Sequence, residues 1–378
     1  MSIAPIRRLG ALAAAAGLAS IAACGPANNG GQTTADAATD TADAATDTAD
    51  GAELSGQIAG SGASSQENAA LAWIAGFTER TDVTVTYDPT GSGTGREQFL
   101  NGTVEFAGSD SPLDEDERAA ATERCFGSEA LELPLYISPI AVVYNLDLDT
   151  EHLNLEGETI AKIFAGEITN WSDPEIAEAN PGVELPDLEI IPVNRSDKSG
   201  TTGNFTEYLD AVAPEVWTHG SVEEWPISGT QSGGQTSGMI DVVTSAEGAI
   251  GYADASRVGD LGTVAVGVGD DFVPYSAEAA AKVVDSSPGT EDATDLRLTI
   301  DLARDVEGSY PIVLISYLLA CGVYDDDAAA ANVAAYLEYV ASEEGQERAA
   351  QPDVAGSAPI SAELRERVTA AIETIDAE

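Results

Sequence analysis

The chain has 378 residues, of which 65 are Asp or Glu and only 16 are Lys or Arg, so its formal net charge at pH 7 is −49. Nucleic acid and anionic membrane surfaces repel a protein of this charge, and neither is expected as a partner. The charge favours solubility, and any anion that the protein binds has to be held by local dipoles.

The first 24 residues are predicted to be an export signal. Arg7 and Arg8 form a basic start, a run of small and apolar residues follows, and Cys24 comes directly after two alanines. This layout is typical of a secretory signal. The ending resembles the lipobox of bacterial lipoproteins, in which Cys24 would carry the lipid. An ordinary cleaved signal with an incidental Cys24 is the alternative.

Residues 25–53 are predicted to be a disordered tether. A heptad of Thr, Ala and Asp starts at Thr34, repeats at Thr41 and begins again at Thr48, and the segment contains no Leu, Ile, Val or aromatic residue. A coiled coil is excluded because its seam would hold only Ala and Asp. Nothing in the segment offsets the entropy of ordering. A flexible coil of this length reaches about 30 Å on average, which suits a domain held away from a membrane.

The part from residue 54 onward is longer than one hydrophobic core usually supports, so two lobes are expected. Strand-like and helix-like segments alternate along it, which favours an α/β sheet with largely parallel strands. Strands are predicted over residues 55–59, 83–87, 104–108, 190–193, 249–253 and the front of 310–321. Helices are predicted over residues 64–79, 95–101, 114–125, 160–166, 203–212, 239–245, 328–350 and 361–376, with a loop at 229–238.

The most apolar stretch, residues 131–145, contains Pro134 and Pro139. It is predicted to form two extended segments, the first of which crosses between the lobes. Besides Cys24 the chain contains Cys125 and Cys321. In an exported protein such a pair favours a disulfide, and two free buried thiols are the alternative.

Three turns share one design, because each follows a predicted strand, contains Gly with Ser or Thr, and opens a helix. Backbone N–H groups at a helix start lack intrahelical partners, and with the helix dipole they form a seat for an anion. Gly lets the backbone approach a ligand, and Ser or Thr supplies a cap and a hydroxyl. The turns are residues 60–65, 90–95 and 199–201, and none has Walker spacing. One such turn alone favours a simple capped loop, whereas the three together predict one anion site.

Charged residues accompany the turns. Arg195 offers a planar fork that suits phosphate oxygens, and Asp197 is expected to hold it in place. Asp110 follows a predicted strand, and a carboxylate beside an anion is favourable when the anion carries a proton that the carboxylate can accept as a hydrogen bond. A simple turn residue or helix cap at Asp110 is the open alternative.

Catalytic and metal-binding patterns are absent from the sequence. The only histidines are His152 and His219, which are predicted to lie at the surface, and no GxSxG elbow occurs. The cysteines are singly placed, so no zinc spacing exists. No cofactor is expected. Trp171, Trp217 and Trp225 are predicted to belong to the core.

Seven motifs cover most of residues 54–256. They are GSGASS at 60–65, TGSGTG at 90–95, FAGSDSPL at 106–113, ISPIAVVYN at 137–145, IFAGEITNW at 163–171, RSDKSGTT at 195–202 and GAIGY at 248–252. Taken in this order, they resemble the phosphate-binding proteins of bacterial high-affinity phosphate ABC transporters, in their lipid-anchored, actinobacterial type.

The resemblance implies an α/β fold of the two-lobed periplasmic-binding-protein type II, with mixed, mostly parallel sheets flanked by helices and a hinge between the lobes. Residues 54–137 with 254–378 would form lobe I, and 138–253 lobe II. The phosphate-binding residues that it implies are Ser64, Ser65 (through its backbone N–H), Ser92, Asp110 as proton acceptor, Arg195 as cation, and Ser199, Gly200 and Thr201 as helix-start donors, with Asp197 orienting Arg195.

The function implied is that of a monomeric, non-enzymatic lipoprotein on the outer face of the cell membrane. It would capture inorganic phosphate and deliver it to the permease subunits of an ABC importer. One alternative is a binder of another oxyanion such as sulfate or molybdate, against which Asp110 argues. The other is an exported phosphoesterase, for which the sequence lacks metal ligands.

Overall fold

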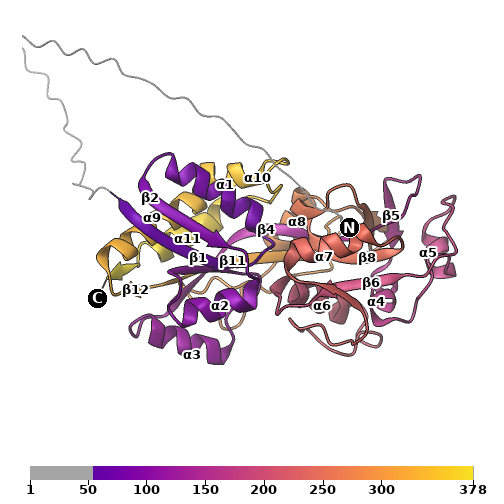
Figure 1. The fold of residues 1–378 in the computed structure, drawn as a ribbon, viewed down its shortest axis with the longest axis horizontal. Coiled ribbons are helices and arrows are strands. Elements are labelled where there is room, and N and C mark those ends of the chain that lie inside the picture. The colour runs from indigo at the N-terminus through magenta and orange to yellow at the C-terminus, as the bar shows by residue number, and fades with distance from the viewer. Residues whose placement is uncertain (1–53, 378) are drawn as a thin grey trace, which may run out of the picture. The chain divides into compact units, whose positions relative to one another are not determined.

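The computed structural model describes residues 54–377, so the predicted signal, the tether and Cys24 lie outside the described residues. One mixed sheet runs through this part in the strand order β2-β1-β3-β11-β4-β8-β6-β7 (Figure 1). Helices cover both of its faces. Within residues 54–377, no helix combines the length and apolarity needed to cross a membrane.

Strand β4 (Ala130–Tyr144) is the centre of the sheet, and all of its residues are buried. Residues 130–139 pair antiparallel with β11 (Val313–Cys321), and residues 140–144 pair antiparallel with β8 (Ala249–Asp254). The strand therefore divides the sheet into two parts. We call the strands on the β11 side part I and those on the β8 side part II.

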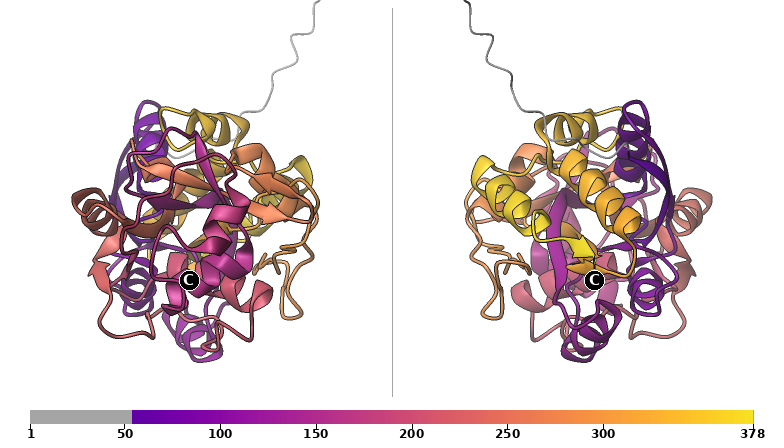
Figure 2. Two further views of the ribbon diagram at one scale, coloured as in Figure 1. Left: turned by 90° about the vertical axis from the view of Figure 1, so that its right-hand side faces the viewer. Right: turned by 90° about the vertical axis from the view of Figure 1, so that its left-hand side faces the viewer.

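Part I joins strands from both ends of the chain. Strand β1 lies between β2 and β3, parallel to both, and β3 pairs antiparallel with β11. Its further strands are β1 (Ser55–Gly62), β2 (Asp82–Asp88) and β3 (Phe106–Ser109). Its helices are α1 (Glu67–Thr78), α2 (Ser92–Leu100), α3 (Glu115–Arg124), α9 (Asp327–Ala341), α10 (Glu343–Ala350) and α11 (Ala362–Ile372). Figure 2 shows α9 and α11 side by side at the end of the molecule where the chain finishes.

Part II is built around β8. Strand β6 lies parallel to β8 and β7, whereas β9 pairs with β4, β5 and β10. Its further strands are β5 (His152–Leu155), β6 (Ile191–Arg195), β7 (Gln231–Gly233), β9 (Gly262–Val268) and β10 (Asp271–Val273). Its helices are α4 (Gly157–Ala165), α5 (Pro174–Ala179), α6 (Gly200–Val212), α7 (Gln235–Ser245) and α8 (Ala277–Asp285), and the short turn η1 (Ala255–Arg257) follows β8.

The prediction of two extended segments at residues 131–145 is wrong, because β4 is continuous through both prolines. Proline cannot donate a hydrogen bond to a neighbouring strand, so it is tolerated at irregular points of a sheet. Pro134 lies beside an irregularity in the register between Ser316 and Tyr317. Pro139 is the last residue of β4 paired with β11, directly before the strand changes partner.

Several other predicted boundaries differ from the structure. The predicted helix at 328–350 is two helices, because Ser342 adopts an extended conformation that ends α9 and caps α10. The predicted loop at 229–238 contains β7 and the start of α7. By contrast, α3 begins where its sequence predicts, since Asp114 and Glu117 form a capping box.

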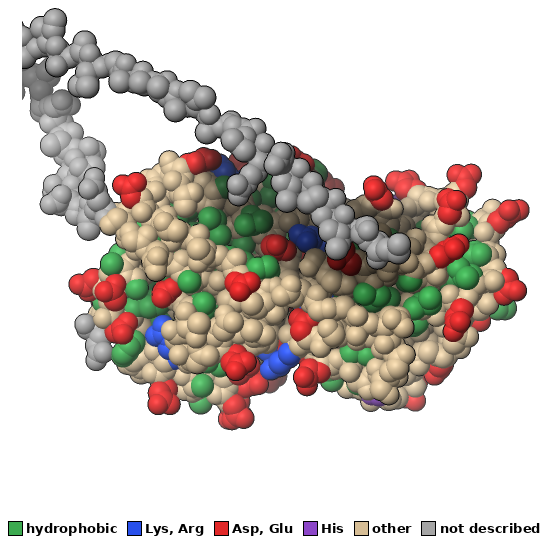
Figure 3. Space-filling model, in the orientation of Figure 1, with side chains coloured by type: hydrophobic (Ala, Val, Ile, Leu, Met, Phe, Trp, Pro, Cys, Tyr) green, Lys and Arg blue, Asp and Glu red, His purple; other side chains and the backbone are tan. Residues whose placement is uncertain are grey.

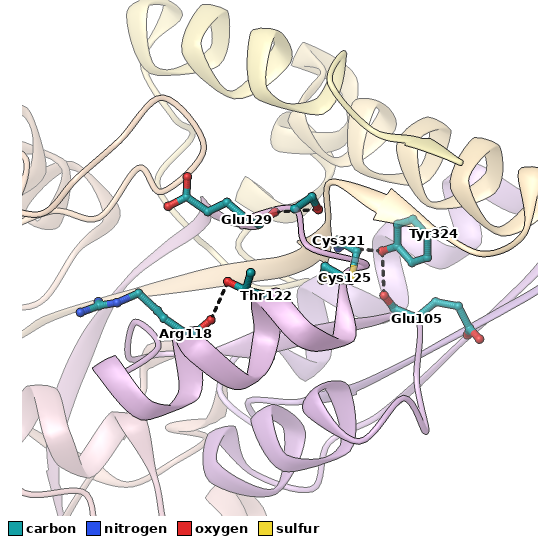
Figure 4. The surroundings of a disulfide bond; sticks show 8 residues. Glu105, Arg118, Thr122, Cys125, Glu129, Cys321 and Tyr324 are labelled. Carbon is teal, nitrogen blue, oxygen red and sulfur yellow. Dashed lines mark hydrogen bonds between the residues drawn. A yellow bond between two sulfur atoms is a disulfide. The ribbon is translucent and has the colours of Figure 1, made fainter. Parts of the chain in front are cut away.

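The predicted disulfide between Cys125 and Cys321 is confirmed (Figure 4). Cys125 ends α3 and Cys321 ends β11, and both are fully buried. Tyr324 stabilises the same corner, because its hydroxyl accepts a hydrogen bond from the Cys321 N–H at 3.0 Å and donates one to the Glu105 carbonyl at 2.8 Å. The disulfide thus joins the end of helix α3 to the end of strand β11, which forms the longest antiparallel pairing in part I.

The excess of acidic residues is a property of the surface. Figure 3 shows carboxylates spread over the visible face, with few lysines and arginines among them. Trp171 and Trp217 are fully buried, as predicted, whereas Trp225 is partly exposed. His219 is exposed and His152 is partly exposed.

Candidate anion-binding site

Asp110 is the point at which the three predicted turns meet. Its Oδ1 accepts a hydrogen bond from the Ser65 hydroxyl at 2.7 Å, and its Oδ2 accepts one from the Thr201 hydroxyl at 2.7 Å. Its backbone N–H donates to the Ser92 hydroxyl oxygen at 3.2 Å. Ser65, Ser92 and Thr201 belong to the first, second and third turn respectively. All four residues are at most 3% exposed, so the three turns converge on one buried carboxylate.

The first turn lies before α1 rather than inside it. The predicted helix at residue 64 begins at Glu67, and the capping position, Gln66, makes no side-chain cap bond. The Ser64 and Ser65 hydroxyls are used elsewhere, Ser65 on Asp110 and Ser64 on Thr236, where the two hydroxyl oxygens are 2.9 Å apart. Both hydroxyls are used in these contacts, and neither caps α1.

The third turn approaches Asp110 through a glycine. Ser199 caps α6, since its hydroxyl accepts from the Thr202 N–H at 3.3 Å. A Cβ on Gly200 would lie 2.8 Å from the Asp110 Cβ, too close for any other residue without a backbone shift. Asn204, one turn along α6, donates to the Asp110 carbonyl at 2.7 Å. The start of α6 is therefore fixed against the Asp110 loop.

Arg195 and Asp197 form a two-bond ion pair beside the second turn. The Arg195 Nε and one Nη donate to the two Asp197 carboxylate oxygens at 2.9 and 2.6 Å. Arg195 is 3% exposed. Gly91 has φ +98°, and a Cβ there would lie 2.5 Å from Asp197 Oδ2, so the second turn packs directly on the pair. The Gln235 N–H also donates to Asp197 at 2.9 Å.

Opposing effects set the protonation of the two carboxyls. Burial raises the pKa of Asp110, although the hydroxyls of Ser65 and Thr201 and the charge of Arg195 act against this rise. Burial acts in the same direction on Asp197, but the hydrogen bonds and charge of Arg195 outweigh it and hold the pKa of that carboxyl below its usual range. Asp197 therefore stays ionised and keeps the Arg195 fork in one orientation.

The amino-acid sequence matches known proteins over most of its length. Residues 16–344 match a family model described as a PBP superfamily domain. The Phosphate-binding protein PstS2 of Mycobacterium bovis BCG is 35% identical over 330 residues, which is 84% of this chain and 87% of that protein. The Phosphate-binding protein PstS 3 of Mycobacterium tuberculosis is 33% identical over 372 residues, 96% of both. The chain belongs to the PstS family of phosphate-binding proteins.

Solved structures share the fold of this PstS-family chain. One is a high-affinity periplasmic phosphate-binding protein, PfluDING, bound with phosphate; its TM-score is 0.68 at 19% identity, over 83% of this chain and 93% of that one. Another is a putative phosphate ABC transporter substrate-binding protein from Clostridium perfringens, with a TM-score of 0.57 at 21% identity, over 79% and 99%. The predicted α/β fold of the periplasmic phosphate-binding type, with mixed sheets flanked by helices, is confirmed.

Two site residues of the PstS-family chain were missed by sequence reasoning. Thr236 starts α7, and its N–H donates to the Ser64 hydroxyl oxygen at 3.0 Å. The stretch 233–238 has the Gly, Ser and Thr composition of the other turns, and that was the available signal. Ser316 of β11 is fully buried, and its hydroxyl acts against the rise that burial causes in the pKa of Asp110. Its apolar neighbours gave no signal, because only the pairing of β11 with β3 brings it near Asp110.

Proposed function

We propose that this chain captures inorganic phosphate at the Asp110 site, outside the cytoplasm, and delivers it to the permease of a phosphate ABC importer. As a PstS-family protein it is a binding component of the transporter and not an enzyme. The observation that carries the proposal is the meeting of all three anion-type turns on a single buried carboxylate.

The chemistry of the enclosed groups fits a protonated tetrahedral oxyanion. The N–H groups of Ser65, Gly200 and Thr201 and the hydroxyls of Ser64, Ser92 and Ser199 would bind phosphate oxygens, with Arg195, oriented by Asp197, as the cation. Ser199 would act through its hydroxyl, because its N–H already donates to the Glu223 carbonyl. An ionised carboxylate has about four acceptor positions, and the two hydroxyls on Asp110 use one on each oxygen. Asp110 therefore retains positions for the proton of hydrogen phosphate.

The site residues come from both parts of the sheet, which supports closure of two lobes over the ligand. We assign residues 54–137 with 254–378 to lobe I and 138–253 to lobe II, except that η1, β9 and β10 would move with lobe II, because β9 pairs with β4 and β5 and β10 pairs with β9. The hinge would lie where β4 changes partner after Pro139 and where Asp254 ends β8 opposite Ile140. The burial of every proposed ligand residue supports a closed form.

A lipid on Cys24 would hold the protein on the outer face of the cell membrane through the tether at residues 25–53. The order of basic, apolar and small residues before Cys24 supports this anchor. The charge of −49 supports a protein without nucleic-acid partners, working as a monomer.

Isothermal titration of the mature protein with phosphate and sulfate tests the proposed function. We expect phosphate to bind at one site and sulfate not to bind at millimolar concentration. Comparable binding of sulfate would favour a general oxyanion binder. Turnover of a chromogenic phosphate ester would instead indicate a phosphoesterase. Among residues 54–377, no cluster of His, Cys, Asp or Glu is arranged to hold a metal ion.

A further inference from the structure

A buried arginine joins the two parts of the molecule directly behind the anion site. Arg96 lies on α2, four residues after Ser92, and its side chain is 2% exposed. Its Nη groups donate to the two carboxylate oxygens of Glu223 at 3.0 and 2.6 Å. Glu223 belongs to the loop that follows α6, so the ion pair links a helix of part I to a loop of part II.

Arg96 also has partners on its own side. Its Nε donates to Glu117 of α3 at 3.0 Å, and one Nη donates to the Ser109 hydroxyl at 2.9 Å. If the two parts separate, Arg96 keeps Glu117 and Ser109 and loses only Glu223. The guanidinium is thus held in place for Glu223 by bonds that do not depend on closure.

Glu223 is tied to the proposed phosphate ligands as well. Its backbone carbonyl accepts a hydrogen bond from the Ser199 N–H at 3.0 Å, and Ser199 caps the helix that points at Asp110. Lys198, next to Ser199, brings its Nζ to 3.4 Å from the Glu223 carboxylate and 3.5 Å from Glu117. A shift of Glu223 would therefore move the start of α6.

Other ion pairs between the two parts are more exposed. In the pair of Arg304 with Glu207 of α6, the glutamate side chain is 46% exposed. In the pair of Arg257 with Glu67 of α1, the two side chains are 25% and 29% exposed. Exposed pairs contribute little, whereas loss of one partner from a buried, hydrogen-bonded pair is costly and mainly accelerates dissociation. At Glu223, burial would raise the pKa, but the hydrogen bonds and charge of Arg96 hold it below its usual range, so the carboxylate stays ionised.

We propose that Arg96 and Glu223 form a closure latch, in which two residues outside the phosphate contacts hold the cleft shut and set the rate of phosphate release. This inference rests on the proposed phosphate function. Both are positioning residues: Arg96 acts through α2 and Ser92, and Glu223 acts through Ser199. The latch closes with two charge-assisted bonds in one fork, which requires the two parts to reach one defined orientation.

Stopped-flow kinetics of phosphate binding to the mature protein tests the latch with a matched pair of variants. Glu223→Gln removes the charge that pairs with Arg96 across the cleft. Glu117→Gln removes the other carboxylate on the same guanidinium, and the Gln amide oxygen can still accept from the Arg96 Nε. Glu117 also approaches Lys198 across the cleft at 3.5 Å, but that lysine is 44% exposed and the pair contributes little. We expect Glu223→Gln to raise the phosphate dissociation rate about 10- to 100-fold, with an association rate within about 3-fold of wild type. Glu117→Gln is expected to leave both rates within about 3-fold. Glu223→Asp, which keeps the charge, is expected to restore part of the slow release.

The outcomes separate the latch from the proposed function. If wild type binds phosphate and Glu223→Gln releases it at the wild-type rate, the latch is overturned and the proposed function stands. An equal increase of the phosphate dissociation rate in the Glu117 and Glu223 variants also overturns the latch. The effect would then come from a loss of any carboxylate partner of Arg96 and not from the contact across the cleft. A wild type that binds no phosphate overturns the proposed function, and the latch with it.

Discussion

Replacement of Asp110 by Asn is expected to remove most of the discrimination between phosphate and sulfate. Near neutral pH phosphate keeps at least one proton, whereas sulfate keeps none. Asp110 is 3% exposed, so an oxyanion beside it meets the carboxylate with little water between them. A phosphate O–H donates a charge-assisted hydrogen bond there, and a bare sulfate oxygen meets a second acceptor.

The size of the effect follows from the distance and the burial. Two like unit charges about 3 Å apart repel by about 5.5 kcal/mol at an effective dielectric constant of ~20. That energy corresponds to roughly 10⁴-fold in affinity, which is the discrimination found at sites built around one required hydrogen-bond donor. We therefore expect wild type to bind phosphate at least about 10⁴-fold more tightly than sulfate.

The Asn variant preserves shape while it changes the charge and the donors. A hydroxyl both donates and accepts, so Ser65 and Thr201 can keep their bonds to the amide. The amide N–H suits either ion. Sulfate affinity is expected to rise by at least about 100-fold, and phosphate affinity to fall by only about 10-fold. Titration of both proteins with both ions at one pH and ionic strength measures this. A wild type that binds the two ions alike, or an Asn variant as selective as wild type, would refute the role given to Asp110.

Three further outcomes are expected. Arg195→Ala should weaken phosphate binding by about 2–5 kcal/mol, and Arg195→Lys should recover only part of the loss because a point charge cannot replace the fork. Calorimetric Kd values for the two variants measure this. If both Kd values equal that of wild type, the anion binds elsewhere. Replacement of Cys125 and Cys321 by Ala should lower the free energy of unfolding in urea by up to about 5 kcal/mol, because the disulfide spans a separation of 196 residues. A variant as stable as the oxidised wild type would contradict this prediction. Burial raises the pKa of Glu132 to about 7, so its contribution to stability should fall by up to about 3 kcal/mol as the pH rises from about 4.5 to 7. Glu132→Gln should therefore gain stability over wild type at pH 8 relative to pH 5, and an equal difference at both pH values would count against this.

The sequence predicts the local features of this fold well, because they depend on neighbouring residues. The capping box of Asp114 and Glu117 marks the start of α3, and the Gly-rich turns mark strand–helix junctions. These rules also led to the turn residues that now lie around Asp110. Helix α1 is an exception. Its predicted cap, Ser64, forms a hydrogen bond with Thr236, which is 172 residues away in the sequence. Rules based on neighbouring residues cannot detect such a distant partner.

Features that depend on pairing between distant strands were not predictable in this way. The two prolines of residues 131–145 indicated breaks, yet the irregularity at Ser316 and the change of partner after Pro139 let one strand pass through both. Ser316 lies in a strongly apolar stretch, and nothing in its neighbouring residues indicated that it lies near Asp110. The Arg96–Glu223 pair, 127 residues apart, gave no pattern in the sequence.

The disulfide also determines the products of proteolytic cleavage of this exported chain. Cys125 and Cys321 lie 196 residues apart, and the intervening chain includes all the helices and further strands of part II with their exposed loops. A single cut in any of those loops leaves two fragments that remain one covalent molecule. A nicked protein therefore runs as one band on a non-reducing gel and as two after reduction.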